Sequence, residues 1–183
     1  MESGLLPRFF ERATRHAFDD LALNDPPAVR YLADLLTRFA RTDALHTVRE
    51  LPARRLEIVA DSLLAIQRAW DPEAPEFNPA HERALRRHIG DYTLFMTGIF
   101  RDYVQRLAVT SYYEHEGRRA YRFVSETERA GGGADAPLFG RLSDRFEAYS
   151  GALTYARKVY FRADRRPPGL LLDDSFFGAF APE

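Results

Sequence analysis

The sequence predicts an all-α protein, a single antiparallel bundle of five to six helices followed by a short apolar C-terminal tail. Apolar residues recur three and four positions apart over most of the chain, which is the spacing of one helix face. No segment shows the alternation of Val, Ile and Thr between turns that is typical of strands. The length of 183 residues, 45% of them hydrophobic, suits one domain with a sizeable core. We expect a bundle domain over residues 1–166 and a tail over residues 167–183.

Segments rich in Pro, Gly and Asp divide the helical pattern into six predicted helices. Asp25 precedes two prolines and is expected to cap the second helix, because Asp favours the N-cap and Pro the first helical turn. Thr110 or Ser111 is expected to cap the fifth. The expected ranges are about 6–20, 26–39, 52–70, 79–108, 110–124 and 138–161.

The fourth predicted helix has the most regular apolar stripe and contains two glycines, Gly90 and Gly98. Each glycine inside a helix costs about 1 kcal/mol relative to alanine, so a compensating contact is expected. One interpretation is close packing of helices at both positions and at Gly117 of the next helix. The other is a flat ligand that lies against the bare backbone. The sequence leaves both open.

The second interpretation requires a ligand pocket formed by the fourth and fifth predicted helices. The candidate ligand-binding residues are His88, Asp91, Tyr92, Phe95, Tyr113 and Tyr121. The apolar period places Asp91 in the interior, and Asp102 follows on the same predicted helix. A buried carboxylate requires a positive or hydrogen-bonding partner. The expected partners are arginines of the next helix, Arg118, Arg119 or Arg122.

Several chemistries lack their motifs in this sequence. There is no cysteine, which excludes disulfides, thiolate metal sites and cysteine nucleophiles. No histidine has the Glu-x-x-His spacing of di-iron bundles. There is no Gly-x-Ser-x-Gly elbow and no glycine-rich nucleotide motif. We therefore expect no catalytic residues, no metal and no cofactor.

Charge and hydropathy limit the classes of partner. The net charge is −1, with acidic and basic residues interleaved, which argues against nucleic-acid binding. No apolar run approaches the ~18 residues needed to span a bilayer, so no membrane partner is expected. The first ten residues lack the pattern of a signal peptide. We expect a cytoplasmic protein.

The C-terminal tail concentrates large apolar side chains. Fully burying each such side chain is worth about 1.5–3 kcal/mol, so exposure to water is unfavourable. The tail is therefore expected either to fold back onto its own bundle or to dock onto another protein chain. Its apolar residues are Leu170, Leu171, Leu172, Phe176, Phe177 and Phe180.

Three spaced motifs lie in the fourth to sixth predicted helices. They are Gly90-Asp91-x-x-Leu94-Phe95-x-x-Gly98-x-Phe100, Val109-x-x-Tyr112-Tyr113-x-x-x-Gly117-x-x-Ala120-Tyr121 and Leu138-Phe139-Gly140-x-Leu142-x-x-x-Phe146. This pattern resembles a family of uncharacterised bacterial all-helical proteins; the resemblance implies the helical fold and no activity. A weaker likeness to haem oxygenases rests on Gly90 and Gly98 in one helix, with His16 in the first helix as the proximal ligand.

The sequence thus leads to two hypotheses of function. The first is a non-catalytic module for protein–protein interaction or assembly, acting as a homo-oligomer or with an unidentified protein partner. The alternative is a bundle that binds a small apolar or planar ligand in a pocket around the helix containing Gly90 and Gly98. In this alternative the protein could be an enzyme similar to haem oxygenases.

Overall fold

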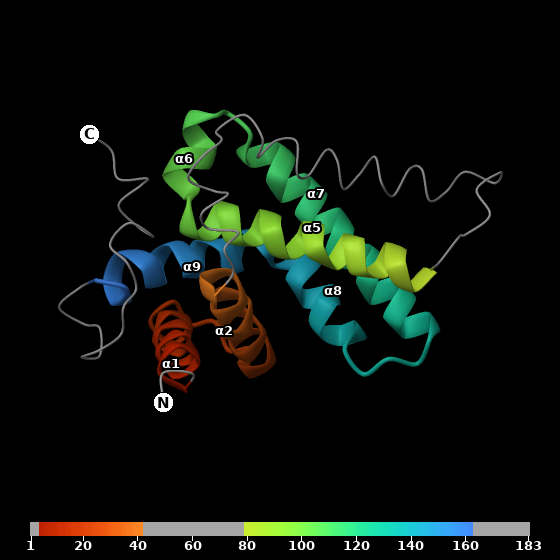
Figure 1. The fold of residues 1–183 in the computed structure, drawn as a ribbon, viewed down its shortest axis with the longest axis horizontal. Coiled ribbons are helices and arrows are strands. Elements are labelled where there is room, and N and C mark those ends of the chain that lie inside the picture. Colours follow the sequence, from red (N-terminus) through yellow and green to blue (C-terminus); the bar gives the residue numbers. More distant parts are fainter. Residues whose placement is uncertain (1–3, 42–78, 163–183) are drawn as a thin grey trace.

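The computed structural model describes residues 4–41 and 79–162, and within these ranges the chain is helical without strands (Figure 1). The prediction of an all-α fold is confirmed. The described helices are α1 (Leu5–Asp20), α2 (Pro26–Arg41), α5 (Pro79–Ile99), α6 (Arg101–Arg106), α7 (Thr110–Ala130), α8 (Ala136–Asp144) and α9 (Phe146–Tyr160). The third predicted helix, over residues 52–70, and the tail over 167–183 lie outside the described residues.

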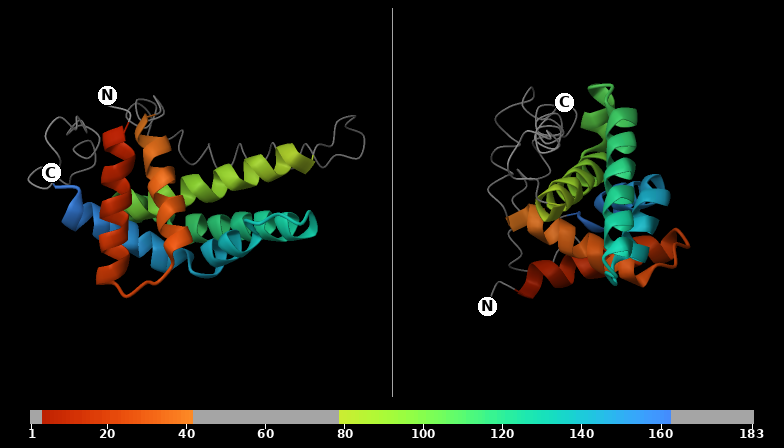
Figure 2. Two further views of the ribbon diagram at one scale, coloured as in Figure 1. Left: turned by 90° about the horizontal axis from the view of Figure 1, so that it is seen from below. Right: turned by 90° about the vertical axis from the view of Figure 1, so that its right-hand side faces the viewer.

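The helices form two groups that cross each other. The first two helices, α1 and α2, run side by side and cross the long direction of α5, α7, α8 and α9 (Figure 2). Within the second group α5 packs on α7 and α9, while α8 packs on α7. The helical hairpin formed by α1 and α2 contacts the second group mainly where α1 packs on α9. This arrangement leaves α5 between its neighbours, at the centre of the fold.

The second half of α5 is buried on every side. Each residue from Ile89 to Phe100 is buried, so this stretch has no solvent-facing stripe. The hydroxyl of Thr93 donates a hydrogen bond of 2.7 Å to the carbonyl oxygen of Ile89. The hydroxyl of Thr97 donates one of 2.8 Å to the carbonyl oxygen of Thr93. Back-bonding of this kind satisfies a hydroxyl inside its own helix. A helix enclosed in this way can therefore carry polar residues without contact with water.

The start of α2 confirms the predicted cap. The Oδ1 atom of Asp25 accepts a hydrogen bond of 3.1 Å from the backbone N–H of Ala28, three residues later. The cap predicted for the fifth helix is wrong. Thr110 is already the first residue of α7, and the N-cap position is occupied by Val109, which offers no side-chain acceptor.

Two predicted helices are each divided in the structure. The fourth breaks at Phe100, where φ is −111° and ψ is 36°, and continues as α6. The sixth breaks at Arg145, with φ −110° and ψ 24°, so that α8 and α9 are separate. Neither residue is Gly or Pro, so no sequence signal marks the bends. The Phe100 side chain is buried and packs on Phe95, five residues earlier, with ring centroids 5.4 Å apart.

Candidate functional site

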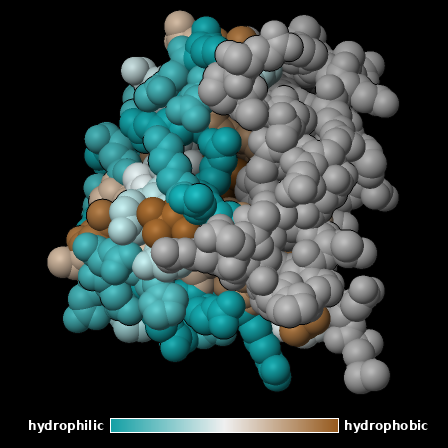
Figure 3. Space-filling view, turned by 90° about the vertical axis from the view of Figure 1, so that its left-hand side faces the viewer, coloured by the Kyte–Doolittle hydropathy of each residue, from teal (hydrophilic) through white to brown (hydrophobic). Residues whose placement is uncertain are grey.

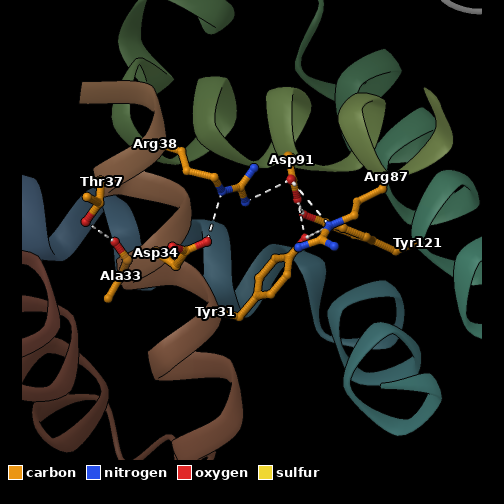
Figure 4. Close-up of polar contacts among 8 residues, drawn as sticks. All are labelled: Tyr31, Ala33, Asp34, Thr37, Arg38, Arg87, Asp91 and Tyr121. Atoms are coloured by element: carbon orange, nitrogen blue, oxygen red, sulfur yellow. Dashed lines mark hydrogen bonds and ion pairs between the residues drawn. The ribbon is translucent and has the colours of Figure 1, made fainter. Parts of the chain in front are cut away.

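A buried carboxylate at the centre of the fold belongs to Asp91 on α5, which is 2% exposed. Its Oδ1 accepts hydrogen bonds from the hydroxyls of Tyr31, at 2.5 Å, and Tyr121, at 2.8 Å. Its Oδ2 lies 3.0 Å from Nη2 of Arg38 and 4.0 Å from Nε of Arg87 (Figure 4). Helices α2, α5 and α7 all contribute to this group of five residues, here called the Asp91 cluster.

The two tyrosine hydroxyls of the Asp91 cluster keep their protons. Burial, together with the nearby Asp91 carboxylate, raises the pKa of Tyr31 and Tyr121 well above the ordinary value, so both remain protonated donors. The carboxylate accepts three hydrogen bonds, from both tyrosines and Arg38, and only 3% of its side chain is exposed. A general base needs access to a substrate proton, and this carboxylate offers none. The geometry fits a structural anchor between α2, α5 and α7.

The expected partners of the two aspartates were wrong. Asp91 pairs with Arg38 of α2, and Asp102 pairs with Arg157 of α9 at 3.6 Å; neither contacts an arginine of α7. Asp102 is also only half-buried, with 45% of its side chain exposed. The signal that was missed is on α2, where Tyr31 and Arg38 are seven residues apart and therefore share one helix face.

A second buried carboxylate, Asp25, joins α2 to α8 and α9. Besides capping Ala28, it accepts hydrogen bonds from Nε of Arg141, at 2.7 Å, and from the hydroxyl of Tyr149, at 2.6 Å. Burial alone would raise the pKa of Asp25, but these three hydrogen bonds outweigh burial and hold it below the ordinary value. Burial and Asp25 raise the pKa of Tyr149 to about 12. The sequence suggested the cap but not the two long-range partners.

Each of the three singled-out glycines lies against a side chain from another helix. A Cβ at Gly90 would lie 2.7 Å from the Tyr121 ring, and a Cβ at Gly98 would lie 2.7 Å from Cβ of Leu153. A Cβ at Gly117 would meet the Phe146 ring at 2.5 Å. The bare backbone at these positions is thus covered by the protein's own side chains, as the close-packing interpretation requires.

Among the described residues, the six candidate ligand-binding residues fall into separate groups. Asp91 and Tyr121 meet in the Asp91 cluster, as described above. Tyr92 and Tyr113 are both buried and contact each other, with ring centroids 6.2 Å apart. Phe95 stacks on Phe39 of α2 at 4.4 Å between ring centroids. His88 is exposed on α5.

The residues assigned by the weaker likeness to haem oxygenases also lie in different surroundings. His16 is exposed on α1 and stacks on Tyr160 of α9, with ring centroids 5.5 Å apart, and no contact joins it to the glycines of α5. Among the residues that the structure describes, no group of three or more His, Asp or Glu side chains could hold a metal ion.

The surface carries an open apolar hollow between the α1–α2 loop and α9, here called the apolar groove. Its volume is about 480 Å³. Leu21, with 41% of its surface exposed, is one of the most exposed large apolar residues in the described part of the chain. On the side of the molecule where α9 ends, apolar side chains gather among hydrophilic ones (Figure 3). The groove is lined by Leu21, Leu23, Glu147, Ala148, Gly151, Thr154, Tyr155 and Lys158.

Comparison with known proteins adds no assignment to this geometry. No protein-family model, curated protein or solved structure matches the chain. Among the described helices, none combines the length and apolar character needed to cross a bilayer.

Proposed function

We propose that this protein is a non-catalytic assembly module whose copies associate through the apolar groove. The observation that carries the proposal is the groove itself, an open hollow with a mainly apolar lining. Exposed apolar patches on soluble domains commonly mark interaction sites. The described polar interior is occupied by structural contacts, as at Asp91 and Asp25, which favours a surface role over catalysis.

The proposed occupant of the groove is the apolar C-terminal segment, residues 170–180, of a second copy. Lys158, which lines the groove, lies four positions before Arg162, the last described residue. The seven residues 163–169 can extend about 23 Å at about 3.3 Å per residue, far enough to reach a neighbouring molecule. Leucine and phenylalanine side chains match the apolar lining. Exchange of this segment between copies would join them into a homo-oligomer.

The test is the mass of the full-length protein in solution, measured by light scattering and sedimentation at several concentrations. We expect a defined oligomer that Leu21→Glu weakens by at least about tenfold, because a carboxylate must lose its water to enter an apolar groove. Phe177→Glu should have the same effect from the other side of the contact. The matched control is Leu5→Glu, because Leu5 is similarly exposed, at 38%, but does not line the groove.

A monomeric wild-type protein at all concentrations would contradict the proposal. Equal dissociation by Leu5→Glu would show that any added charge disrupts the oligomer and that the groove has no special role.

The ligand-binding alternative receives no comparable support. Within the described residues, Tyr121 and Leu153 occupy the space beside Gly90 and Gly98, where a planar ligand was expected. We therefore do not extend the proposal to a haem-oxygenase-like enzyme.

A further inference from the structure

A second hollow lies where the first turns of α2 and α8 meet the middle of α5. Its volume is about 540 Å³, within the range of about 300–1,000 Å³ common for small-molecule sites. Three arginines line it, each from a different helix: Arg30 of α2, Arg87 of α5 and Arg141 of α8. We call this hollow the arginine pocket. It shares no lining residue with the apolar groove.

Two of the three guanidinium groups are held in place by contacts behind them. Nε of Arg87 donates to the hydroxyl of Tyr31 at 3.2 Å, and its guanidinium carbon lies 5.3 Å from the centre of the Tyr31 ring. Nε and Nη2 of Arg141 donate to Asp25 at 2.7 and 3.3 Å. Among the described residues, no hydrogen bond or ion pair uses the two Nη groups of Arg87 or Nη1 of Arg141. Donors are therefore already oriented before a ligand arrives, which reduces the entropy cost of binding.

The third guanidinium, on Arg30, is exposed and makes no hydrogen bond or ion pair with the described residues. One acidic residue, Asp135, also lines the arginine pocket, so the three arginines leave an excess of positive charge in the lining. The buried carboxylates behind the pocket are already engaged, Asp91 by Arg38 and two tyrosines, and Asp25 by Arg141 and a tyrosine. The unused donors thus belong to residues that line the pocket, and the buried carboxylates behind it are already engaged.

We propose that the arginine pocket binds a small molecule through its phosphate group. A guanidinium presents parallel N–H donors that match two phosphate oxygens. A tetrahedral phosphate presents more oxygens, in more directions, than a planar carboxylate, so guanidinium groups from three helices can donate to it at once. Leu138 and two prolines supply an apolar part of the wall, which leaves room for the organic portion of a phosphate ester.

The test is calorimetric titration of the full-length protein in chloride buffer of constant ionic strength. The probes are inorganic phosphate, glucose 6-phosphate and glucose. We expect binding of at least one phosphate-bearing probe and none of glucose. Binding of inorganic phosphate without the ester identifies the ion as the ligand, and tighter binding of the ester indicates that the apolar wall contributes. Either result supports recognition of the phosphate group.

The variant Arg30→Gln should weaken that binding by about tenfold, the effect expected for loss of one charge-assisted contact. Arg30 is exposed and has no described partner, so this change should leave folding intact. Arg12→Gln is the matched control, because Arg12 is also exposed but lies on α1 and does not line the pocket. The proposal is overturned if neither phosphate probe binds at about 10 mM, if Arg30→Gln binds as tightly as wild type, or if Arg12→Gln causes the same loss.

Discussion

Two aspartates that contact the same arginine allow a direct measurement of what burial adds to an ion pair. Arg38 donates through Nε to Asp34 at 2.9 Å and through Nη2 to Asp91 at 3.0 Å (Figure 4). The distances are nearly equal, but the Asp34 side chain is 63% exposed and that of Asp91 is 3% exposed. The substitutions Asp34→Asn and Asp91→Asn therefore make the same chemical change in two environments.

The structure indicates a large difference between the two variants. Hydrogen bonds to a charged group contribute about 1.5–3 kcal/mol each, and Asp91 accepts two from buried tyrosines. The asparagine oxygen in the place of Oδ1 can still accept both tyrosine hydrogen bonds, but without the negative charge, while its NH₂ group turns a donor toward Arg38. The contribution of Arg38 is discounted because its side chain is 42% exposed and water can replace the lost partner. We expect Asp91→Asn to lower the free energy of unfolding by about 2–4 kcal/mol.

For Asp34→Asn the expected loss is below about 0.5 kcal/mol, as for other exposed ion pairs within one helix. Urea denaturation at pH 7, followed by circular dichroism, measures both values. Equal losses in the two variants would refute the reasoning, because they would show that burial and the tyrosine hydrogen bonds add nothing to the Asp91 contact. A loss at Asp34 larger than that at Asp91 would refute it more strongly.

Two further pairs of measurements test the packing and the acid response. Gly117→Ala should destabilise the protein by about 1–3 kcal/mol, because the new methyl group would meet the Phe146 ring. Gly151→Ala should stabilise α9 by about 0.5–1 kcal/mol, because a methyl group there would meet no atom within 4 Å. Thermal unfolding measures both changes. A stabilising Gly117→Ala would show that the close approach is not required. The pKa of Asp25 is below the ordinary value, so its carboxylate stabilises the fold above about pH 4 and this contribution disappears as the pH falls through the folded-state pKa. The difference in stability between wild type and Asp25→Asn should therefore be largest near pH 7 and should shrink as the pH falls below about 4. A constant difference in urea midpoint across the acidic range would argue against the lowered pKa.

The sequence predicted best what depends on neighbours along the chain. Asp25 was identified as a helix cap because the cap and its acceptor geometry span only three residues. The burial of Asp91 followed from the apolar period of its own helix. Its partner did not follow, because a period identifies a buried face but not which helix covers that face. Arg38, 53 positions earlier in the chain, is brought to Asp91 by tertiary packing.

The candidate pocket shows the same limit. Gly90 and Gly98 were correctly singled out as places of close approach, but a bare backbone has the same signature whether a side chain or a ligand covers it. The neighbours that decide between these, Tyr121 and Leu153, lie 31 and 55 residues further along the chain. The arginine pocket was missed because its three arginines are far apart in a sequence where arginine is common. The pocket can be recognised only in the folded structure, where α2, α5 and α8 bring the three arginines together.

The attachment of the first two helices to the last one has a consequence for synthesis on the ribosome. Asp25 accepts hydrogen bonds from Arg141 and Tyr149, and Phe10 packs against Phe161 with ring centroids 5.4 Å apart. The hairpin of α1 and α2 therefore leaves the exit tunnel long before the residues that complete its contacts. Until α8 and α9 have emerged, Asp25 lacks both long-range donors and the part of α1 that packs on α9 is uncovered. Folding of the N-terminal helices is thus coupled to translation of residues more than a hundred codons downstream. Rare codons late in the message would lengthen the time during which the nascent chain exposes these helices to chaperones and proteases.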